Sequence, residues 1–551
     1  MSADANDSSA DRSIPPLRNI RPLYVDRLPP CNHACPAGEN IQGWLAEAQA
    51  GRYRAAWDIL VRDNPMPAVH GRVCYHPCED VCNRREVDEP VSVHAVERFL
   101  GDLALEERWA FEPAQPASGK RVLVVGAGPS GLSAAYHLTR LGHAVTIHEA
   151  GPMSGGMMHF GIPKYRLPRE VLDAEIRRIE ALGVTIVLNH KVKDLLAEQQ
   201  AGRFDAVFVA VGAHLSKRQS IPSQDAGRIF DALQFLRDVE SGAEAPKIGR
   251  RVAVYGGGNT AMDAARTARR LGAETVIIYR RTREQMPAHD FEADEALDEG
   301  VSIRWLRTIK EIHGSTITVE VMRLDGSGFP QPTGEVETLE ADSLVLALGQ
   351  ETDTSFLEAV PGVQFAKDGT VLVAPDMMTG RPGIFAGGDM VPSERTVTSA
   401  VGHGKKAARY IDAWLAGRVA HPHSRPEIAT GGMLHLWYDV EALRARQAAI
   451  DLTQRTSTFD EVVHGLDAGA ARYEAQRCLS CGNCFECDGC FSACPEHAIL
   501  KLGPGRRYLV DLALCTGCAV CFDQCPCAAI TMVVEPGPMT TGATGASGMR
   551  R

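Results

Sequence analysis

The chain has 551 residues, of which 44% are hydrophobic and 23% are charged, and its formal net charge is −11. This composition is typical of a globular protein with roughly two to four domains, and the negative charge argues against a nucleic-acid-binding protein. No apolar run reaches the roughly 18 residues that a membrane-spanning helix needs, and the polar start MSADANDSSADRS lacks the features of a signal peptide. We therefore expect a cytoplasmic protein without a membrane span.

The 16 cysteines fall into two groups, one within residues 31–82 and the other within residues 478–527. The long middle of the chain contains none. Because disulfides are rare in a reducing cytoplasm, cysteines gathered in this way indicate ligands of metal ions or iron–sulfur clusters rather than structural bridges.

The hydrophobic pattern changes along the chain. Residues 41–63 carry apolar residues at helical spacing, interrupted at Gly51, and predict a helical pair. Residues 101–118 carry few apolar residues and contain the segment PAQPASG, so this range indicates a linker. From Lys120 the pattern becomes strand, Gly-rich turn, helix and strand, and this βαβ pattern recurs from Arg250.

The first βαβ unit, RVLVVGAGPSGLSAAYHLTRLGHAVTIHEA, spans residues 121–150. Gly126, Gly128 and Gly131 have the GxGxxG spacing that permits a tight turn, a close approach to a pyrophosphate and helix packing. The helix that follows offers unpaired N–H groups to phosphates, and Glu149 ends the second strand, where a carboxylate accepts from ribose hydroxyls. A Gly-rich turn without a ligand is the alternative, but the order of all these parts favours a dinucleotide.

The second unit, residues 251–281, has Gly256, Gly258 and Ala261 in the permitted GxGxxA form, with Asn259 and Thr260 in the same turn. Its second strand ends in Arg280 and Arg281 instead of an acid. Since guanidinium groups can bind a 2′-phosphate, we expect NADP(H) here. Arginines at a solvated strand end are the alternative.

Two such units suggest FAD at the first and a nicotinamide at the second. The segment RPGIFAGGDM, residues 381–390, resembles the late FAD motif of two-dinucleotide flavoproteins, with Gly388 and Asp389 after an apolar strand. The helix predicted within 396–408 starts beside the flavin and carries Thr398.

The C-terminal cysteines repeat the spacing C-x2-C-x2-C-x3-C-P, which is typical of two-cluster bacterial ferredoxins. In that pattern the fourth cysteine of each run serves the other cluster. A zinc ribbon is the alternative, but it seldom uses this doubled spacing. The predicted ligand sets are Cys484, Cys487, Cys490 and Cys525 for one cluster, and Cys515, Cys518, Cys521 and Cys494 for the other.

The sequence thus predicts an α/β protein with two Rossmann-like dinucleotide-binding domains, an α-helical N-terminal cluster domain and a small α+β ferredoxin domain. The expected boundaries are 1–118 for the helical iron–sulfur domain and linker, 119–249 and 351–430 for the FAD-binding domain, 250–350 for the NADP(H)-binding domain, 431–475 for a helical connector, 476–536 for the ferredoxin domain and 537–551 for a disordered tail.

A series of motifs within residues 31–415 resembles the family of the NADPH-dependent glutamate synthase small (β) subunit. That family includes the large subunit of the NADH-dependent ferredoxin:NADP oxidoreductase and the N-terminal half of dihydropyrimidine dehydrogenase. The motifs are CNHACPAGENI, GRVCYHPCEDVC, GAGPSG, GGMMHFGIPKYRLP, GGGNTAMDAAR, YRRTREQMPA and GIFAGGD. The resemblance implies FAD, NAD(P)H and N-terminal 4Fe-4S clusters. It also implies that Gly156, Lys164 and Arg166 lie beside the flavin, the last two as candidate catalytic residues.

The resemblance further assigns Cys35, Cys74 and Cys78 to one cluster, with Glu97 as a carboxylate fourth ligand. Without the family, Glu97 could equally be a surface acid of a helix. Family members usually open with a further C-x2-C pair, which is missing here. Cys31 therefore has no neighbouring cysteine pair with which to complete the ligand set of a cluster.

Cys31 and Cys82 form half of a cluster site, and Cys478-x2-Cys481 resembles the missing family opening, moved to the far end of the chain. If these four cysteines share a cluster, the protein holds four clusters. If Cys478 and Cys481 are spare thiols, it holds three. Cys527 remains unassigned.

These motifs predict an oxidoreductase that transfers electrons between NADP(H) and a ferredoxin-type acceptor or partner through FAD and 4Fe-4S clusters. The direction of flow stays open. Expected redox partners are a 2-oxoacid:ferredoxin oxidoreductase, the glutamate synthase large subunit or free ferredoxin. Two alternatives are a glutamate synthase small subunit, which the added ferredoxin module disfavours, and a redox sensor without turnover, which the intact dinucleotide motifs disfavour.

Overall fold

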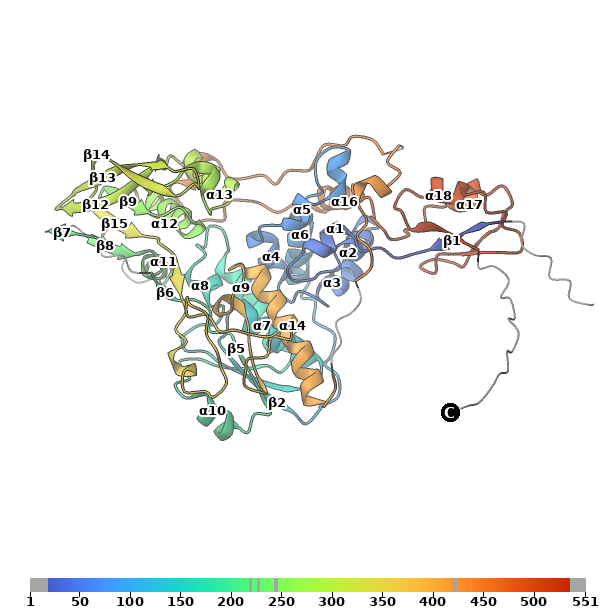
Figure 1. The fold of residues 1–551 in the computed structure, drawn as a ribbon, viewed down its shortest axis with the longest axis horizontal. Coiled ribbons are helices and arrows are strands. Elements are labelled where there is room, and N and C mark those ends of the chain that lie inside the picture. The colour runs from blue at the N-terminus through green and yellow to red at the C-terminus, as the bar shows by residue number, and fades with distance from the viewer. Residues whose placement is uncertain are drawn as a thin grey trace, which may run out of the picture.

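The computed structural model describes residues 18–217, 221–224, 228–241, 246–419, 425–437 and 439–535. The predicted tail at 537–551 lies outside them. The chain is elongated, with two parallel-sheet parts on one side, the N-terminal helices in the middle and the cysteine-rich C-terminal module at the far end (Figure 1). The predicted α/β fold class, with two Rossmann-like parts and a helical N-terminal part, is confirmed.

The N-terminal part is a set of short helices that bury two tryptophans. Asn40 begins α2 by accepting a hydrogen bond from Gly43 N at 3.2 Å. Trp44 and Trp57 are fully buried between the helices. The elements are α1 (Pro30–Ala34), α2 (Ile41–Gln49), α3 (Tyr53–Leu60), α4 (Pro67–Val73), α5 (Pro77–Asp80), η1 (Asn83–Glu86) and α6 (Val93–Glu106).

Two glycines allow α4 and α6 to pack closely. A Cβ on Gly71 would lie 2.4 Å from the Arg98 backbone, and one on Gly101 would lie 2.3 Å from Ala68 N. This contact holds Cys74, at the end of α4, on the same side of the domain as the first turns of α6.

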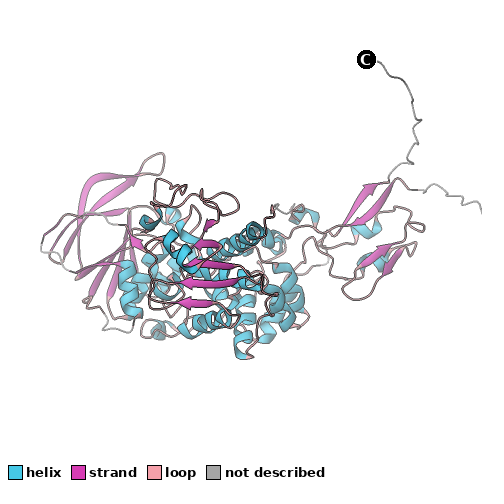
Figure 2. Cartoon of the chain, turned by 90° about the horizontal axis from the view of Figure 1, so that it is seen from below, coloured by secondary structure: helices cyan, strands magenta, loops and turns pink. Residues whose placement is uncertain are grey.

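The first parallel sheet has the strand order β17-β5-β2-β3-β4, and helices flank its strands (Figure 2). After the exposed Arg121, its central strand β2 is buried and apolar from Val122 to Val125, as expected for a sheet covered on both faces. The elements are β2 (Arg121–Val125), α7 (Pro129–Arg140), β3 (Ala144–His148), α8 (Met157–Phe160), α9 (Arg169–Glu180), β4 (Thr185–Val187), α10 (Leu195–Gly202), β5 (Ala206–Val209), β17 (Ile384–Ala386), η4 (Gly388–Met390) and α14 (Val397–Leu415).

The second parallel sheet has the order β11-β10-β9-β15-β8. The chain leaves the first sheet after β5 and returns to it at β17, so the second sheet is inserted into the first part. The elements are β8 (Arg228–Asp231), α11 (Ala232–Glu240), β9 (Arg251–Tyr255), α12 (Asn259–Arg270), β10 (Glu274–Tyr279), η2 (Arg283–Gln285), α13 (Asp290–Asp298), β11 (Ser302–Trp305) and β15 (Ser343–Leu346).

A four-stranded sheet of order β14-β13-β12-β7 extends the second part, and a two-stranded sheet of β6 and β16 lies where the chain crosses between the two parts. The remaining elements of this region are β6 (Leu215–Ser216), β7 (Ser223–Gln224), β12 (Arg307–His313), β13 (Thr316–Leu324), β14 (Pro330–Glu340), β16 (Gln350–Glu351) and η3 (Ser355–Leu357).

The connector predicted to be helical is mostly extended. Its described helices are η5 (Gly431–Met433), α15 (Leu452–Arg455) and α16 (Ala468–Gln476), and residues 440–448 cross the N-terminal helices without forming a helix. Arg444 there binds Glu79 and Ser92, and Ala445 N donates to Glu474 at 2.5 Å. These tertiary contacts override the helix propensity of EALRARQAA.

The C-terminal module contains two short helices and two pairs of strands. Its last strand pairs with a strand from the start of the chain, β1 (Ile20–Tyr24), as Figure 1 shows. The other elements are α17 (Gly489–Ala493), β18 (Ile499–Lys501), β19 (Tyr508–Val510), α18 (Val520–Asp523) and β20 (Ile530–Val534). Within the described residues, no helix is long and apolar enough to cross a bilayer.

Candidate electron-transfer site

The Gly-rich turn after β2 forms a cradle that a side chain would fill. A Cβ on Gly126, whose φ is +105°, would lie 2.4 Å from Ala210 O, and one on Gly131 would lie 1.9 Å from Gly126 O. Gly128 instead faces open space, and no side chain caps the first turn of α7 beside it. The free N–H groups of this helix start therefore fit a pyrophosphate.

Two further predicted FAD residues lie around this turn. The Glu149 carboxylate, at the end of β3, accepts hydrogen bonds from Ala127 N at 2.8 Å and Gly151 N at 2.7 Å. These bonds fix its position and leave lone pairs for a ribose hydroxyl. A Cβ on Gly156 would lie 2.9 Å from Gly128 Cα, so Gly156 packs directly against the Gly-rich turn.

The third FAD motif reaches the same place from β17. A Cβ on Gly388 would lie 3.1 Å from Ser130 Cβ in α7. Burial raises the pKa of the neighbouring Asp389 to about 6. Thr398, near the start of α14, is buried. Uncapped N–H groups and closely packed glycines around one cradle are features that FAD fits.

The turn after β9 repeats this arrangement. A Cβ on Gly256 would lie 2.2 Å from Ala347 O, whereas Gly258 faces open space. Ala261 is buried where α12 packs on the sheet, and Thr260 precedes it in the first turn of that helix.

Arg280 and Arg281 follow β10, and neither forms an ion pair within the part of the chain that the structure describes. Arg280 is exposed and Arg281 is half-buried. The Nε of Arg281 is buried without a hydrogen-bond partner. Two unpaired guanidinium groups at this strand end fit the 2′-phosphate of NADP(H).

Asn259 contacts the N-terminal domain. Its Nδ2 donates to the hydroxyl of Tyr75 at 2.6 Å, and its Oδ1 accepts from His289 N at 3.2 Å. The Tyr75 ring stacks on His289 with centroids 3.7 Å apart. Tyr75 was not predicted as a site residue from the sequence, although it directly follows the predicted cluster ligand Cys74.

Arg166 and Lys164 lie between the two dinucleotide-binding parts. Arg166 forms ion pairs with Asp263 of α12 at 2.9 Å and with Glu292 of α13 at 2.5 Å. Lys164 is exposed, and its Nζ lies 5.0 Å from the centroid of the Phe459 ring. The catalytic role inferred for both from the resemblance stays a prediction, and Arg166 additionally joins the two parts.

The structure brings the predicted N-terminal ligands together. We call Cys35, Cys74, Cys78 and Glu97 the flavin-side set. Burial and the charge of Glu97 raise the pKa of the Cys74 thiol to about 12, and the Thr398 hydroxyl opposes this shift. The Glu97 carboxylate accepts a hydrogen bond from Asn64 Nδ2 at 2.8 Å. It is buried, so it is not a surface acid.

A second buried carboxylate, which the sequence reasoning missed, lies beside Glu97. Glu39 accepts from the same Asn64 amide at 3.1 Å, and its charge raises the pKa of the Cys35 thiol after the larger effect of burial. The motif CNHACPAGENI contains Glu39, which was the available signal.

Four cysteines from opposite ends of the chain line one pocket, and we call them the shared set: Cys31, Cys82, Cys478 and Cys481. Burial raises the pKa of the Cys478 thiol to about 12 and that of Cys481 to about 11, and neighbouring thiols add to both shifts. No described cysteine forms a disulfide. Desolvated thiols gathered without a disulfide fit thiolate ligands that a bound cationic cluster would stabilise.

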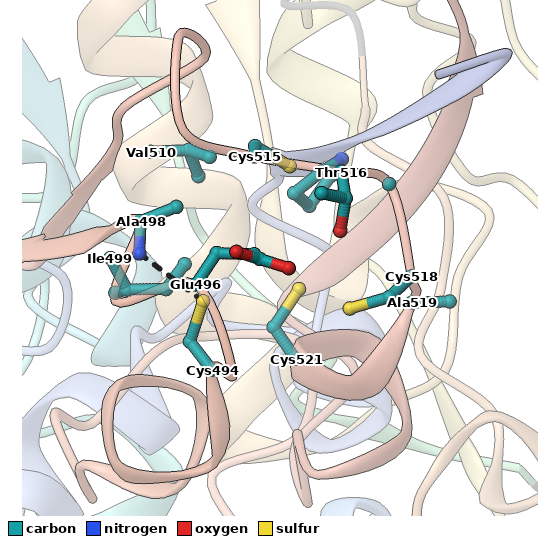
Figure 3. Close-up of a pocket in the computed structure, with 12 residues that line it drawn as sticks. Cys494, Glu496, Ala498, Ile499, Val510, Cys515, Thr516, Cys518, Ala519 and Cys521 are labelled. Carbon is teal, nitrogen blue, oxygen red and sulfur yellow. Dashed lines mark hydrogen bonds between the residues drawn. The ribbon is translucent and has the colours of Figure 1, made fainter. Parts of the chain in front are cut away.

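The C-terminal cysteines gather in two further sets. The first ferredoxin set is Cys484, Cys487, Cys490 and Cys525, and the second ferredoxin set is Cys494, Cys515, Cys518 and Cys521. Burial and the other three thiols of the first set raise the pKa of Cys490 to about 11. The second set lines a pocket into which the sulfurs of Cys494, Cys518 and Cys521 point (Figure 3). Glu496 reaches into the same pocket.

Comparison with known proteins agrees with these features. Residues 120–404 match the family described as pyridine nucleotide-disulphide oxidoreductase, and residues 25–109 match dihydropyrimidine dehydrogenase domain II, 4Fe-4S cluster. The NADP(+)-dependent formate dehydrogenase subunit beta of Moorella thermoacetica is 39% identical over 498 residues, covering 82% of this chain and 70% of that protein. The NADPH-Fe(3+) oxidoreductase subunit beta of Geobacter sulfurreducens is 35% identical, covering 83% and 76%. The NAD-dependent dihydropyrimidine dehydrogenase subunit PreT of Escherichia coli is 34% identical, covering 70% and 91%.

Proposed function

Because the chain belongs to the pyridine nucleotide-disulphide oxidoreductase family, we propose that it is the subunit through which a larger complex exchanges electrons with NADP(H). It is an iron–sulfur, NADPH-dependent oxidoreductase. The proposed route runs from NADP(H) through FAD to the flavin-side set, the shared set and the two ferredoxin sets, in either direction.

The contact between Thr398 and Cys74 supports the first step of this route. Thr398 lies near the start of α14, beside the FAD cradle, and its hydroxyl affects the pKa of the Cys74 thiol. A residue of the flavin site therefore adjoins a ligand of the flavin-side set. Short spacing of this kind favours one-electron transfer between the two sites.

The observation that carries the proposal is the pocket of the shared set. Cys31 lies in α1, seven residues after the end of β1, and Cys481 lies three residues before Cys484 of the first ferredoxin set. A cluster on these four cysteines would bridge the N-terminal helices to the C-terminal module. Without it, the flavin-side set and the ferredoxin sets would belong to separate parts of the molecule.

When bound, nicotinamide and flavin exchange a hydride, and the flavin and the clusters exchange electrons singly. The protein's own residues fix the positions of the dinucleotide-binding parts and the cluster-bearing helices relative to one another. Arg166 ties α12 and α13 to the FAD-binding part, and Tyr75 ties α12 to the cluster-bearing helices. Both contacts fix the turn that would bind NADP(H) relative to the flavin.

The relatives suggest what lies beyond the ferredoxin end. Two of them are named as β subunits, one of a formate dehydrogenase and one of an NADPH-Fe(3+) oxidoreductase. We propose that this chain likewise serves a partner oxidoreductase, of which a 2-oxoacid:ferredoxin oxidoreductase is one candidate class and free ferredoxin another. A glutamate synthase large subunit is the weaker alternative, because that role does not need a built-in ferredoxin module.

The test uses the double variant Cys478→Ser/Cys481→Ser. It should lose about four irons per chain, one 4Fe-4S cluster, and keep FAD and reduction of the flavin by NADPH. Electron transfer from NADPH to a viologen dye at the ferredoxin end should collapse. Cys527→Ser is the matched control, since Cys527 belongs to no set and its variant should keep every iron. An unchanged iron count in the double variant would refute the bridge.

A further inference from the structure

The N-terminal strand β1 completes the sheet of the C-terminal module. It pairs antiparallel with β20 over its whole length, from Ile20 opposite Val534 to Tyr24 opposite Ile530. Arg18 extends the contact through an ion pair with Glu535 at 3.0 Å. The module is therefore built from both ends of the chain.

The pairing places Tyr24 against a ligand of the first ferredoxin set. The Tyr24 hydroxyl lies 3.2 Å from Cys490 Sγ, and its ring stacks on Tyr508 with centroids 6.2 Å apart. A cysteine that ligates iron carries no proton, so Tyr24 must be the donor in this hydrogen bond.

Cys527, which the spacing leaves unassigned, contacts the same set. Its Sγ lies 3.9 Å from Cys525 Sγ, and the residue is buried. Its backbone carbonyl accepts a hydrogen bond from Gly482 N at 2.6 Å, which fixes its position. With Cys525 as a thiolate ligand, Cys527 becomes a second side-chain donor, weaker than the hydroxyl.

The second ferredoxin set has no such donors. In the part of the chain that the structure describes, only backbone N–H groups, such as Ala498 N at 3.3 Å from Cys494 Sγ, donate to its sulfurs. Tyr508 of β19, whose ring stacks on Tyr24, directs its hydroxyl to Asp488 Oδ1 at 2.6 Å and not to a sulfur. The two sets are alike in ligand spacing and unlike in the side chains that face their sulfurs.

We propose that Tyr24 and Cys527 are positioning residues that raise the reduction potential of the cluster on the first ferredoxin set above that of the second. Hydrogen bonds to ligand sulfurs stabilise the more negative, reduced cluster, so added donors raise its potential. This inference rests on the cluster assignments of the proposed function. Its consequence is that an electron in the module resides on the cluster next to the shared set until a stronger acceptor is available.

The experiment is a potentiometric titration of the full-length, anaerobically purified protein, followed by electron paramagnetic resonance. Tyr24→Phe should move one cluster signal to a more negative potential, leave the others in place, and keep the wild-type iron and FAD content. Cys527→Ala should move the same signal in the same direction, and the double variant should move it further. If Tyr24→Phe loses iron, the inference is tested by the reduction potential of the Cys527→Ala variant alone.

The matched control is Tyr508→Phe, which removes a hydroxyl that binds Asp488 and no sulfur. It should leave the signal where the wild type has it. Potentials unchanged in both test variants, or an equal shift in Tyr508→Phe, would overturn the inference. A wild-type protein without the iron content and signals of a ferredoxin module would refute the proposed function instead.

Discussion

Replacing Arg280 and Arg281 with alanine tests the predicted coenzyme choice. Both side chains follow β10 without an ion pair in the described chain, so their removal leaves no acid unpaired and should not disturb the fold. Each charge-assisted hydrogen bond to a 2′-phosphate contributes about 1.5–3 kcal/mol. Arg280 is exposed and Arg281 is half-buried, so we take the lower part of that range for the pair, about 3 kcal/mol in total.

That energy corresponds to about a 10²-fold loss of kcat/KM for NADPH. NADH lacks the 2′-phosphate, so its kcat/KM should change little. Arg281→Ala should cost more than Arg280→Ala, because its guanidinium is less hydrated. The assay is anaerobic reduction of a viologen dye with each coenzyme. A wild type that prefers NADH, or an equal loss for both coenzymes, would show that these arginines do not read the phosphate.

Three further outcomes follow from the described contacts. Extraction should yield one FAD per chain and no FMN, and recovery of FMN from the wild type would contradict the predicted cofactor. Gly131→Val should lose the flavin, because its Cβ would lie 1.9 Å from Gly126 O. Arg166→Ala removes the ion-pair partner of the buried acids Asp263 and Glu292 and should lower the free energy of unfolding by about 3–5 kcal/mol in denaturant titrations. The exposed control Lys164→Ala should change it by less than about 0.5 kcal/mol. Burial raises the pKa of Asp389 to about 6, above its unfolded value, so this group's contribution to stability falls as the pH rises from about 4 to about 6. Asp389→Asn should therefore raise the melting temperature more at pH 7.5 than at pH 5, and an equal change at both values would contradict the shift.

The parts of the site that depend on local spacing could be predicted from the sequence. Gly126, Gly128 and Gly131 perform three different steric tasks within six residues, so one short motif contains the whole cradle. The gathering of the shared set could be anticipated because the assigned ligand sets left five cysteines over, and four of them, all but Cys527, complete one further set.

Features that depend on distant contacts could not be predicted. The segment IRPLY has no strong strand pattern, and nothing near Ile20 indicates that its partner is β20. The connector around Arg444 has good helix formers, yet its bonds to Glu79 and Ser92 hold it extended. Arg166 lies in a Gly/Pro-rich loop without periodicity, so only its partners Asp263 and Glu292 reveal its place between the two parts.

The pairing of β1 with β20 has a consequence for biosynthesis. Arg18 and Glu535, which form an ion pair beside the two strands, lie 517 residues apart in the chain. At roughly 5–20 residues per second, translation separates their appearance by about 25 to 100 seconds. For most of that interval Cys31 and Cys82 have been synthesised while Cys478 and Cys481 have not. The early thiols must stay reduced until the end of synthesis, so loading of the shared set is the step of maturation most exposed to oxidants.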